Sequence, residues 1–563
     1  MRQTEKKHVQ ELIRTLVQMG LRHVVISPGS RNAPLSYSFA FHPDVETHTV
    51  VDERSAAFIA LGMAQTLKEP VAVICTSGSA AINYGPAVAE AYYQHIPLLV
   101  LTADRPKELI DQGIGQSIRQ PNMYANYVKG SFELEEVKTN SDSLPHARGL
   151  INEAWNLCVA PHQGPVHINV PMREPLYGMA EVGDSEPRIK KTQSAVPDLT
   201  ESHWSELQTK LEKSVKTLVI LGQMQQEIEP EVLGKWAKKN SAIVLTETTC
   251  NLSTAGFFPC IDQLIMSMSE EQQENFVPDL LITAGHNLIS RKIKSLLKGK
   301  VAAHWHVDVA DKNLDTFQCL TATIPVPVSK FLSTLADFNS TESTYHSDFQ
   351  HIHSTNKKSH SEYLKNIDYS DLSVFSQFLP ALPTDSMLQM GNSSVVRYIQ
   401  LFESRTDIEY KGNRGVSGID GCTSTAVGAA AMTKKPVTLI TGDLAFFYDA
   451  NGLWNKMVPD NLKIIIVNNS GGGIFRIIDG PGQSGALEEV FEVPHNRTAK
   501  MICQDHEISY KFAHSAEELN AELKSIFIQK GAGVLEVFTP REVNDKVLKG
   551  YFKFLKKSFK KLK

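Results

Sequence analysis

The sequence predicts three α/β domains, each built on a parallel sheet that helices cover on both faces. Short apolar runs rich in β-branched residues alternate with helix-length segments, and most runs end in Gly, Ser, Asp or Pro. Strands that are apolar on both faces are typical of parallel sheets buried between helices. Two polar stretches, at about 180–200 and 338–371, interrupt the alternation. We therefore expect three domains, over 1–182, 200–338 and 370–563, with a linker in each polar stretch.

Each predicted strand is a short apolar run between turn-forming residues. In the first domain, helical segments such as 55–66 and 80–93 separate the strands, as expected for doubly wound β–α–β units. The first-domain strands are 23–27, 47–51, 71–76, 98–103 and 166–170. The second-domain strands are 217–222, 242–247, 279–285 and 304–309. The third-domain strands are 386–393, 436–443, 462–469 and 533–539.

The composition is that of a soluble globular protein. Hydrophobic residues make up 42% and charged residues 21%, and no apolar run is long enough to cross a bilayer. The net charge of −5 argues against nucleic-acid binding. The first 20 residues form an amphipathic helix pattern rather than a secretory signal. Seven scattered cysteines without a CxxC pair predict free thiols in a reducing, cytoplasmic setting.

The C-terminus is predicted to form a basic amphipathic helix. Residues 546–563 contain eight lysines and no acid, and apolar residues recur at helical spacing. Either this apolar seam packs on the body or on another subunit, or the helix attaches loosely to anionic lipid. The first alternative is the more common one. No stable membrane insertion is expected.

Two strands of the last domain end in side chains suited to a metal. Asp443 ends TLITGD, and Asn469 with three following glycines ends IIIVNNSGGG. Parallel strands place their carboxyl ends at one sheet edge, where ligands bind. Carboxylate, amide and carbonyl oxygens suit Mg²⁺, which completes its octahedron with phosphate oxygens and water. The sequence therefore predicts a metal–diphosphate site at this edge.

This paired motif resembles the thiamine-diphosphate signature of the pyruvate-decarboxylase-like superfamily. Leu444 stands where many members have a second glycine, which points to a subgroup. The resemblance implies the thiamine-diphosphate-binding fold, thiamine diphosphate with Mg²⁺ or Mn²⁺ as cofactors, and active sites between subunits. It therefore implies a homodimer or homotetramer.

Glu53 is the candidate catalytic residue. It lies at a strand-to-helix junction in VVDERSAAFIALGMA, where a lone glutamate more often interacts with the helix dipole. With the metal motif downstream, the resemblance implies that Glu53 contacts the cofactor pyrimidine and promotes loss of the thiazolium proton. Ile419, in RGVSGIDG, matches the bulky residue that bends the cofactor, although an ordinary buried isoleucine is the alternative.

Several arginines lie in turns after predicted strands, where an active-site cleft would be. Guanidinium groups match carboxylates geometrically, so this set favours substrates with several carboxylates. The residues are Arg31 with Ser30, Arg105, Gln116, Arg119, Arg291 with Lys292, Arg397 and Arg414.

Eight strings, in this order along nearly the whole chain, resemble the 2-succinyl-5-enolpyruvyl-6-hydroxy-3-cyclohexene-1-carboxylate (SEPHCHC) synthase family. They are VISPGSRNAPL, DERSAAFIALGMA, TSGSAAINYGPAVAEA, LTADRP, GNSSVVR, NRGVSGIDG, GDLAFFYD and VNNSGGGIF. The resemblance implies decarboxylation of 2-oxoglutarate and 1,4-addition of the succinyl-semialdehyde carbanion to isochorismate, giving SEPHCHC and CO2 in menaquinone biosynthesis. Both substrates are dianions, in agreement with the arginine set.

The same resemblance implies roles for individual residues. The implied metal ligands are Asp443, Asn469 and the Gly471 carbonyl. The implied cofactor contacts are Glu53, Ser77, Gly391, Asn392, Ser393, Gly418, Ile419, Asp443, Leu444, Ala445, Asn469, Gly471, Ile474 and Phe475. The implied substrate contacts are Ser30, Arg31, Arg105, Gln116, Arg291, Lys292, Ser393, Arg397 and Arg414, with Ile474, Phe475 and Ile478 as an apolar wall. The family commonly has Lys-Arg where this chain has Arg291-Lys292, so which of the two contacts substrate stays open.

Two other functions are compatible with parts of the sequence. An acetolactate-synthase-like or oxoacid-decarboxylase activity on a monoanion would not require the arginine set. A non-catalytic scaffold that kept the fold would not need to retain Glu53, Asp443 and Asn469.

Overall fold

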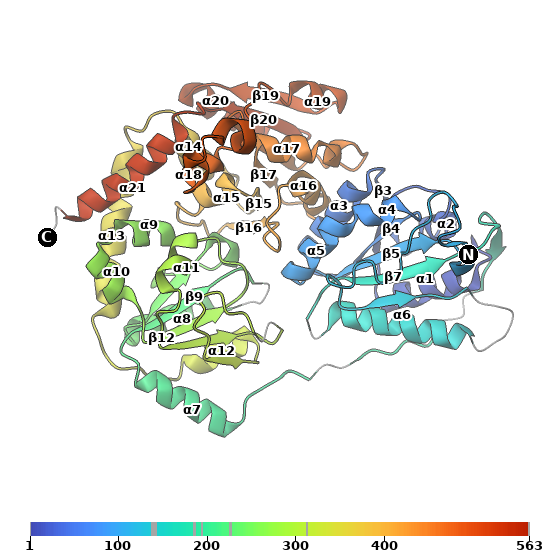
Figure 1. Ribbon diagram of the computed structural model, residues 1–563, viewed down its shortest axis with the longest axis horizontal. Helices are drawn as coiled ribbons and strands as arrows, with labels where there is room; N and C mark the ends of the chain where they lie inside the picture. Colours follow the sequence, from blue (N-terminus) through green and yellow to red (C-terminus); the bar gives the residue numbers. More distant parts are fainter. Residues whose placement is uncertain are drawn as a thin grey trace.

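The protein contains three six-stranded parallel α/β sheets, which confirms the predicted fold class (Figure 1). The computed structural model describes residues 2–136, 143–160, 162–183, 187–192, 195–224, 228–310 and 313–560. All seven cysteines are free thiols, and six of them are buried. Within these described ranges, none of the helices has the length and apolar character to cross a bilayer.

The first sheet has the strand order β3-β2-β4-β5-β7-β6, with all neighbours parallel. Its strands are β2 (His23–Ile26), β3 (Glu46–Thr49), β4 (Val71–Cys75), β5 (Leu98–Asp104), β6 (Ser131–Glu133) and β7 (Val166–Pro171). Val24 and Ile26 enter one hydrophobic core and Val25 enters another, so both faces of the sheet are covered. A short antiparallel pair, β1 (Arg2–Thr4) with β8 (Met179–Glu181), lies outside it.

The third sheet repeats this order, as β16-β15-β17-β18-β20-β19. Its strands are β15 (Ser386–Met390), β16 (Ile408–Gly412), β17 (Val437–Gly442), β18 (Leu462–Asn468), β19 (Ser509–Ala513) and β20 (Gly533–Phe538). The central sheet has the order β11-β10-β9-β12-β13-β14. Its strands are β9 (Thr217–Leu221), β10 (Ile243–Thr246), β11 (Phe257–Phe258), β12 (Leu280–Ala284), β13 (Ala303–Val307) and β14 (Ala322–Ile324).

Helices cover both faces of the sheets (Figure 1). In the first domain they are α1 (Lys7–Met19), α2 (Ala33–Ala40), α3 (Glu53–Leu67), α4 (Ser79–Asn83), α5 (Gly85–Gln94) and α6 (Ser143–Val159). The central part has α7 (Glu201–Glu212), α8 (Pro230–Lys239), α9 (Ile261–Ser267), α10 (Glu270–Phe276), α11 (Arg291–Leu297), α12 (Val328–Leu335) and α13 (Tyr345–Leu364). The last domain has α14 (Asp371–Ala381), α15 (Ser394–Ile399), α16 (Cys422–Ala431), α17 (Asp443–Tyr448), α18 (Ile474–Ile477), α19 (Lys500–Asp505), α20 (Ala516–Ile528) and α21 (Asn544–Lys560).

The stretch expected as the second linker is largely helical, because α13 occupies most of it. Its apolar face is sparse, with Tyr345, Phe349 and Ile352 buried among small polar residues. Because so few apolar residues mark the buried face, the helical spacing is difficult to recognise in the sequence.

The apolar seam of the C-terminal helix α21 packs on the body of the protein. Leu548, Tyr551 and Leu555 are buried against α9 and α13, as Figure 1 shows for the course of the helices. The lysines at 546, 549, 553, 556 and 557 are exposed. This arrangement corresponds to the first of the two alternatives for this helix; Leu562 lies outside the described residues.

Helices α3 and α16 cross at backbone contact distance, and this crossing joins the first and last domains. A Cβ atom at Gly62 would lie 2.0 Å from the carbonyl oxygen of Thr425. A Cβ atom at Gly428 would likewise lie 2.0 Å from the carbonyl oxygen of Ile59. Both helices contribute to one continuous hydrophobic core, so only glycine fits at these two positions.

Gly62→Ala should therefore destabilise the protein by about 1–3 kcal/mol, because the clash is with backbone that cannot rotate away. Gly149→Ala is the matched control, since Gly149 lies in helix α6 and a Cβ atom there would have no neighbouring atom within 4 Å. The control should be neutral or stabilising. The midpoint of thermal unfolding measures both, and equal midpoints for the two variants would contradict the close crossing.

Candidate active site

Asp443 and Asn469 lie together at the carboxyl edge of the third sheet. Asp443 follows β17 and is buried, and its Oδ2 accepts a hydrogen bond from the Gly471 N–H at 2.9 Å. Its Oδ1 accepts from the Leu444 N–H at 2.7 Å. His495 Nε2 lies 3.2 Å from Oδ2. This sheet edge therefore places a carboxylate and backbone N–H groups close together, as a site for a metal ion and a diphosphate would require.

The side-chain oxygen of Asn469 is available to a metal. Its Nδ2 donates to Asp371 Oδ2 at 3.0 Å, whereas its Oδ1 is buried and has no hydrogen-bond partner among the described residues. A buried acceptor left unsatisfied is costly, about 1–3 kcal/mol. A hard cation at this oxygen would remove that cost, so the residues present fit Mg²⁺ or Mn²⁺.

Asp371 fixes which way the Asn469 amide faces. Its other oxygen accepts from Thr539 Oγ1 at 2.6 Å and from Asn544 Nδ2 at 2.9 Å. Burial raises the pKa of Asp371 to about 6, and the charge of Asp443 is a further cause that raises it. Asp371 thus lies close to Asp443 without being part of any predicted motif.

Gly471 contacts Asp443 through its N–H, while its carbonyl accepts from the Gly473 N–H at 2.9 Å. The predicted use of that carbonyl as a metal ligand stays a prediction. Glycines leave room at this edge: a Cβ at Gly391 would lie 2.9 Å from the Ile440 carbonyl oxygen. One at Gly473 would meet the Asn469 amide at 2.8 Å.

Asn392 organises the loop that bears Gly418 and Ile419. Its Nδ2 donates to the Gly418 carbonyl at 2.7 Å, and its Oδ1 accepts from Arg414 at 2.6 Å. Ser393 has a positive φ of 68°, a backbone conformation that is energetically unfavourable for residues other than glycine. Ile419 is 37% exposed, so it is not the ordinary buried isoleucine that the sequence left open.

Glu90 of α5 anchors the same loop from the first domain. Its buried carboxylate accepts backbone hydrogen bonds from Gly415, Val416 and Ser417 at 2.5, 2.7 and 3.3 Å. Burial raises the pKa of Glu90, and these three donors oppose the rise. A side chain of the first domain thereby sets the loop that places Arg414 and Ile419.

Arg291, Arg397 and Arg414 converge from two domains. Burial lowers the pKa of Arg397, and the nearby charges of Arg291 and Arg414 lower it further. Burial also lowers the pKa of Arg414, which lies beside Glu247. Arg397 therefore lies within electrostatic range of two other cations, a grouping that favours a bound polyanion.

The adjacent Arg291 and Lys292 face different charges. Arg291 lies within electrostatic range of Arg397, whereas Lys292 acts on Asp262. Both are exposed at the start of α11, where Ser290 is the N-cap. The buried Glu247 accepts from the Ile289 and Ser290 N–H groups and so holds this turn, and burial raises its pKa to about 7.

The predicted residues of the first domain form a second group, at the carboxyl edge of their own sheet. Ser77 Oγ donates to the Gln116 carbonyl at 2.8 Å, and Arg105 donates to the Gly115 carbonyl at 2.8 Å. Arg31 donates to the Met172 carbonyl at 3.0 Å, and no described residue bonds its buried Nε. Ser30 is exposed beside it, and Arg119 is bound to Asp111 in the same surface loop.

Glu53 begins α3 and accepts a hydrogen bond from Asn83 Nδ2 at 3.4 Å. Its neighbours tie this helix end to the last domain: Asp52 caps α3 and accepts from Asn451 at 2.8 Å, and Arg54 donates to the Tyr448 carbonyl at 2.8 Å. Among these described contacts, Glu53 makes no bond to the Asp443 group.

The predicted apolar wall lies after β18. Ile474 and Phe475 lie in the short helix α18, Ile478 follows it, and all three are half-buried. Phe475 packs against Phe491 with ring centroids 5.5 Å apart. Ala445 is buried in α17 behind Asp443.

The structure thus brings the predicted residues together in two groups and adds partners that sequence reasoning missed. Asp371, Glu90, Glu247 and His495 each contact a predicted residue or its loop. Their only sequence signal is an acidic or imidazole side chain near a helix end or turn, which is common elsewhere.

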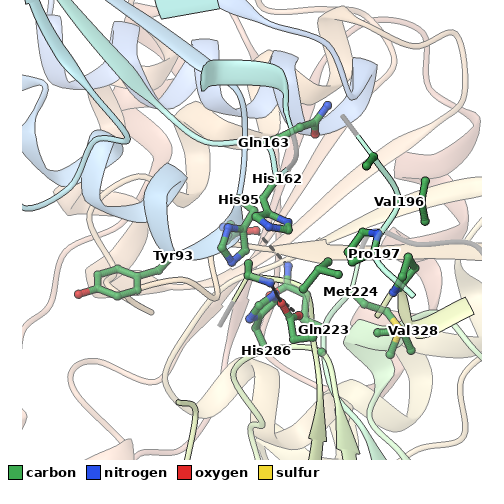
Figure 2. Close-up of a pocket in the computed structure, with 17 residues that line it drawn as sticks. Tyr93, His95, His162, Gln163, Val196, Pro197, Gln223, Met224, His286 and Val328 are labelled. Atoms are coloured by element: carbon green, nitrogen blue, oxygen red, sulfur yellow. Dashed lines mark hydrogen bonds and ion pairs between the residues drawn. The ribbon is translucent and has the colours of Figure 1, made fainter. Parts of the chain in front are cut away.

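An interdomain cavity of about 290 Å³ lies apart from both groups. Figure 2 shows His95 and Gln163 of the first domain opposite Met224, His286 and Val328 of the central domain. None of the predicted site residues lines it.

Comparison with known proteins defines the class. The profile for the N-terminal TPP binding domain of thiamine pyrophosphate enzymes matches residues 6–123, and the profile for the C-terminal TPP binding domain matches residues 389–537. The protein is therefore a thiamine-diphosphate enzyme.

Curated relatives narrow the class to one family. A 2-succinyl-5-enolpyruvyl-6-hydroxy-3-cyclohexene-1-carboxylate synthase of Christiangramia forsetii is 42% identical over 97% of this chain and 98% of its own length. Synthases of the same name from Flavobacterium johnsoniae and Flavobacterium psychrophilum are 41% and 42% identical, also over 97% of this chain and 98% of theirs. The chain belongs to the SEPHCHC synthase family.

Asp371→Asn tests the role of Asp371 in orienting Asn469. The two donors on Asp371 Oδ1 should keep an oxygen there, so the new amide nitrogen would face Asn469 and turn its nitrogen toward the metal. We expect Mg²⁺-dependent affinity for thiamine diphosphate to fall at least about tenfold. Titration calorimetry at fixed Mg²⁺ measures it, with exposed Asp368→Asn as control. Unchanged affinity would show that Asp371 does not orient Asn469.

Proposed function

We propose that this protein decarboxylates 2-oxoglutarate and adds the resulting succinyl-semialdehyde unit to isochorismate, giving SEPHCHC and CO2 in menaquinone biosynthesis. The observation that supports this best is the convergence of Arg291, Arg397 and Arg414 near the thiamine-diphosphate edge. A site for a small monoanion would not need three neighbouring guanidinium groups. The name shared by relatives of about 40% identity supports the same reaction.

The metal and diphosphate are assigned to the carboxyl edge of the third sheet. Asp443 and Asn469 Oδ1 would hold Mg²⁺ or Mn²⁺, with Gly471 as the third predicted ligand, and Gly391 to Ser393 would lie against the diphosphate. Thiamine diphosphate, when bound, supplies a nucleophilic carbon and an electron sink for decarboxylation. The exposed Ile419 and the Gly418 carbonyl, held by Asn392, would support the pyrimidine end.

Glu53 would hold the proton-relay position at the cofactor pyrimidine, as its carboxylate at the start of α3 permits. In a homodimer or homotetramer with sites between subunits, the Glu53 edge of one chain would complete the Asp443 edge of another. Ser77 would lie at the same end of the cofactor. Intersubunit sites would account for the separation of the two groups of predicted residues at different sheet edges of one chain.

The substrates are assigned by charge. Arg397, Arg414 and Ser393, with Arg291 rather than Lys292, would bind carboxylates of the 2-oxoglutarate portion and of isochorismate. Ser30, Arg31, Arg105 and Gln116 would contact isochorismate, and Ile474, Phe475 and Ile478 would exclude water from its ring. We also propose domains at 1–182, 200–338 and 370–563 and a cytoplasmic location, which the free cysteines support.

The direct test is an assay of isochorismate absorbance with purified protein, thiamine diphosphate, Mg²⁺ and 2-oxoglutarate. Absorbance should fall only when every component is present. No loss under these conditions, with cofactor binding confirmed by calorimetry, would reject the reaction and favour a non-catalytic cofactor-binding protein.

Glu53→Gln should retain thiamine-diphosphate binding and lose turnover by at least about 100-fold, because the amide is not an effective proton acceptor. Glu69→Gln, exposed beyond the end of α3, is the control. Calorimetry and the isochorismate assay separate binding from turnover. Near-normal turnover of the Glu53 variant would remove Glu53 from the mechanism.

Arg397→Ala should reduce kcat/KM for 2-oxoglutarate about 10- to 100-fold, the range for losing a charged hydrogen bond. Arg405→Ala is the control, since Arg405 pairs with Asp407 at the opposite, amino end of β16. Steady-state kinetics at saturating isochorismate provide the measurement. Equal kcat/KM in both variants would place the substrate carboxylate elsewhere.

A further inference from the structure

Two histidines and a glutamate meet at the outer edge of the first sheet, away from the candidate active site. His23 is the first residue of β2, and Glu46 and His48 lie on the edge strand β3. His23 is the register partner of Glu46. Glu46 and His48 are two residues apart in the strand, so all three side chains project from the same face.

Their ligand atoms already surround one point. His23 Nδ1 lies 3.7 Å from Glu46 Oε2, and His48 Nε2 lies 3.7 Å from Glu46 Oε1. All three ligand atoms lie within 4.8 Å of one another. The two rings are stacked, with centroids 6.0 Å apart and planes inclined by 19°.

Within the part of the chain that the structure describes, the facing imidazole nitrogens accept and donate no hydrogen bonds. His23 Nδ1 and His48 Nε2 are both buried without a hydrogen-bond partner there, and only 10% of the His48 side chain is exposed. Buried polar nitrogens nearly always have a hydrogen-bond or metal partner. Two such nitrogens directed at one carboxylate therefore point to a cation that all three groups would share. Glu46, 64% exposed, opens the group to solvent and so gives an ion access to it.

We propose that His23, Glu46 and His48 bind a divalent transition-metal ion of the Zn²⁺ type, with water completing its coordination. Two imidazoles and one carboxylate suit Zn²⁺, Co²⁺, Ni²⁺ or Cu²⁺, whereas Mg²⁺ prefers oxygen ligands. Zn²⁺ bonds of about 2.0–2.2 Å at tetrahedral angles separate ligand atoms by roughly 3.3 Å. Small rotations of the three side chains would bring their ligand atoms from the present separations to this distance.

The surroundings of His48 favour its neutral form. Burial lowers the pKa of His48, and the charge of His23 lowers it further, against the opposing effect of Glu46. A neutral imidazole at neutral pH is the form that binds a metal.

The position assigns this ion a structural role. His23 and Glu46 are the first residues of β2 and β3, and His48 lies within β3, whereas the cofactor and substrate residues follow carboxyl ends of strands. Strand β3 is short, polar and at the sheet edge, and the chain runs from it directly into Glu53 and α3. The ion would hold this edge strand in register with β2.

Co²⁺ is the probe, because its visible absorption reports nitrogen ligands and low coordination number. Untagged full-length protein is stripped with a chelator and then saturated with thiamine diphosphate and Mg²⁺, which fills the oxygen site. Co²⁺ should then give intense visible bands that saturate at one ion per chain and disappear when Zn²⁺ is added. The midpoint of thermal unfolding should rise with Zn²⁺.

His23→Gln and His48→Gln should each weaken Co²⁺ binding at least about tenfold and abolish the Zn²⁺-induced rise in the unfolding midpoint. His203→Gln, an exposed histidine of α7, is the control and should bind as the native protein does. Glu46→Gln, at a largely exposed position, tests the same site if a histidine variant fails to fold. Absence of the bands, or bands unchanged in His23→Gln, His48→Gln and Glu46→Gln, would overturn the proposal.

Discussion

The close crossing of α3 and α16 fixes how the first domain packs against the last. The contact is reciprocal: Gly62 meets the Thr425 carbonyl, Gly428 meets the Ile59 carbonyl, and in each helix the glycine lies three residues after the carbonyl. The two helices follow equivalent edge strands, β3 and β16, in sheets of identical order. The first and last domains therefore meet as related halves. Glu53 starts one of the crossing helices, and Gly418 and Ile419 precede the other.

Buried carboxylates then hold the functional loops. Glu90, Glu247 and Asp371 each accept hydrogen bonds from backbone or amide groups of a loop that bears a candidate residue. Burial raises the pKa of all three, to about 7 for Glu247 and about 6 for Asp371. Loops fixed in this way would keep Arg414, Arg291 and the Asn469 amide oriented before the proposed substrate and metal bind, which is the preorganisation that catalysis requires.

The sequence predicted the interior strands well because their apolar, β-branched runs are buried on both faces. It missed the edge strands β6, β11, β14, β16 and β19, which are short or mixed in polarity. Helix α13 was missed for a similar reason, since small polar residues fill much of its buried face. The pattern of apolar and polar residues predicts a helix or strand poorly when only part of its surface is buried.

The candidate site likewise contains some residues that could be predicted from the sequence and others that could not. Asp443, Asn469 and the arginines were predicted because turns after strands place side chains at a sheet edge, and that logic needs only local sequence. Asp371 lies 98 residues before its partner Asn469, and Glu90 lies 325 residues before Gly415. Such partners are brought together only by the fold. The two unsatisfied imidazoles of His23 and His48 likewise become visible only when β2 and β3 pair.

Neighbouring guanidinium groups at the thiamine-diphosphate edge are proposed to select a dicarboxylate donor. The most direct measurement compares kcat/KM for 2-oxoglutarate and for pyruvate, each with isochorismate, thiamine diphosphate and Mg²⁺. We expect a strong preference for 2-oxoglutarate, because pyruvate lacks the distal carboxylate that the arginines would bind. Efficient turnover of pyruvate without turnover of 2-oxoglutarate would contradict it.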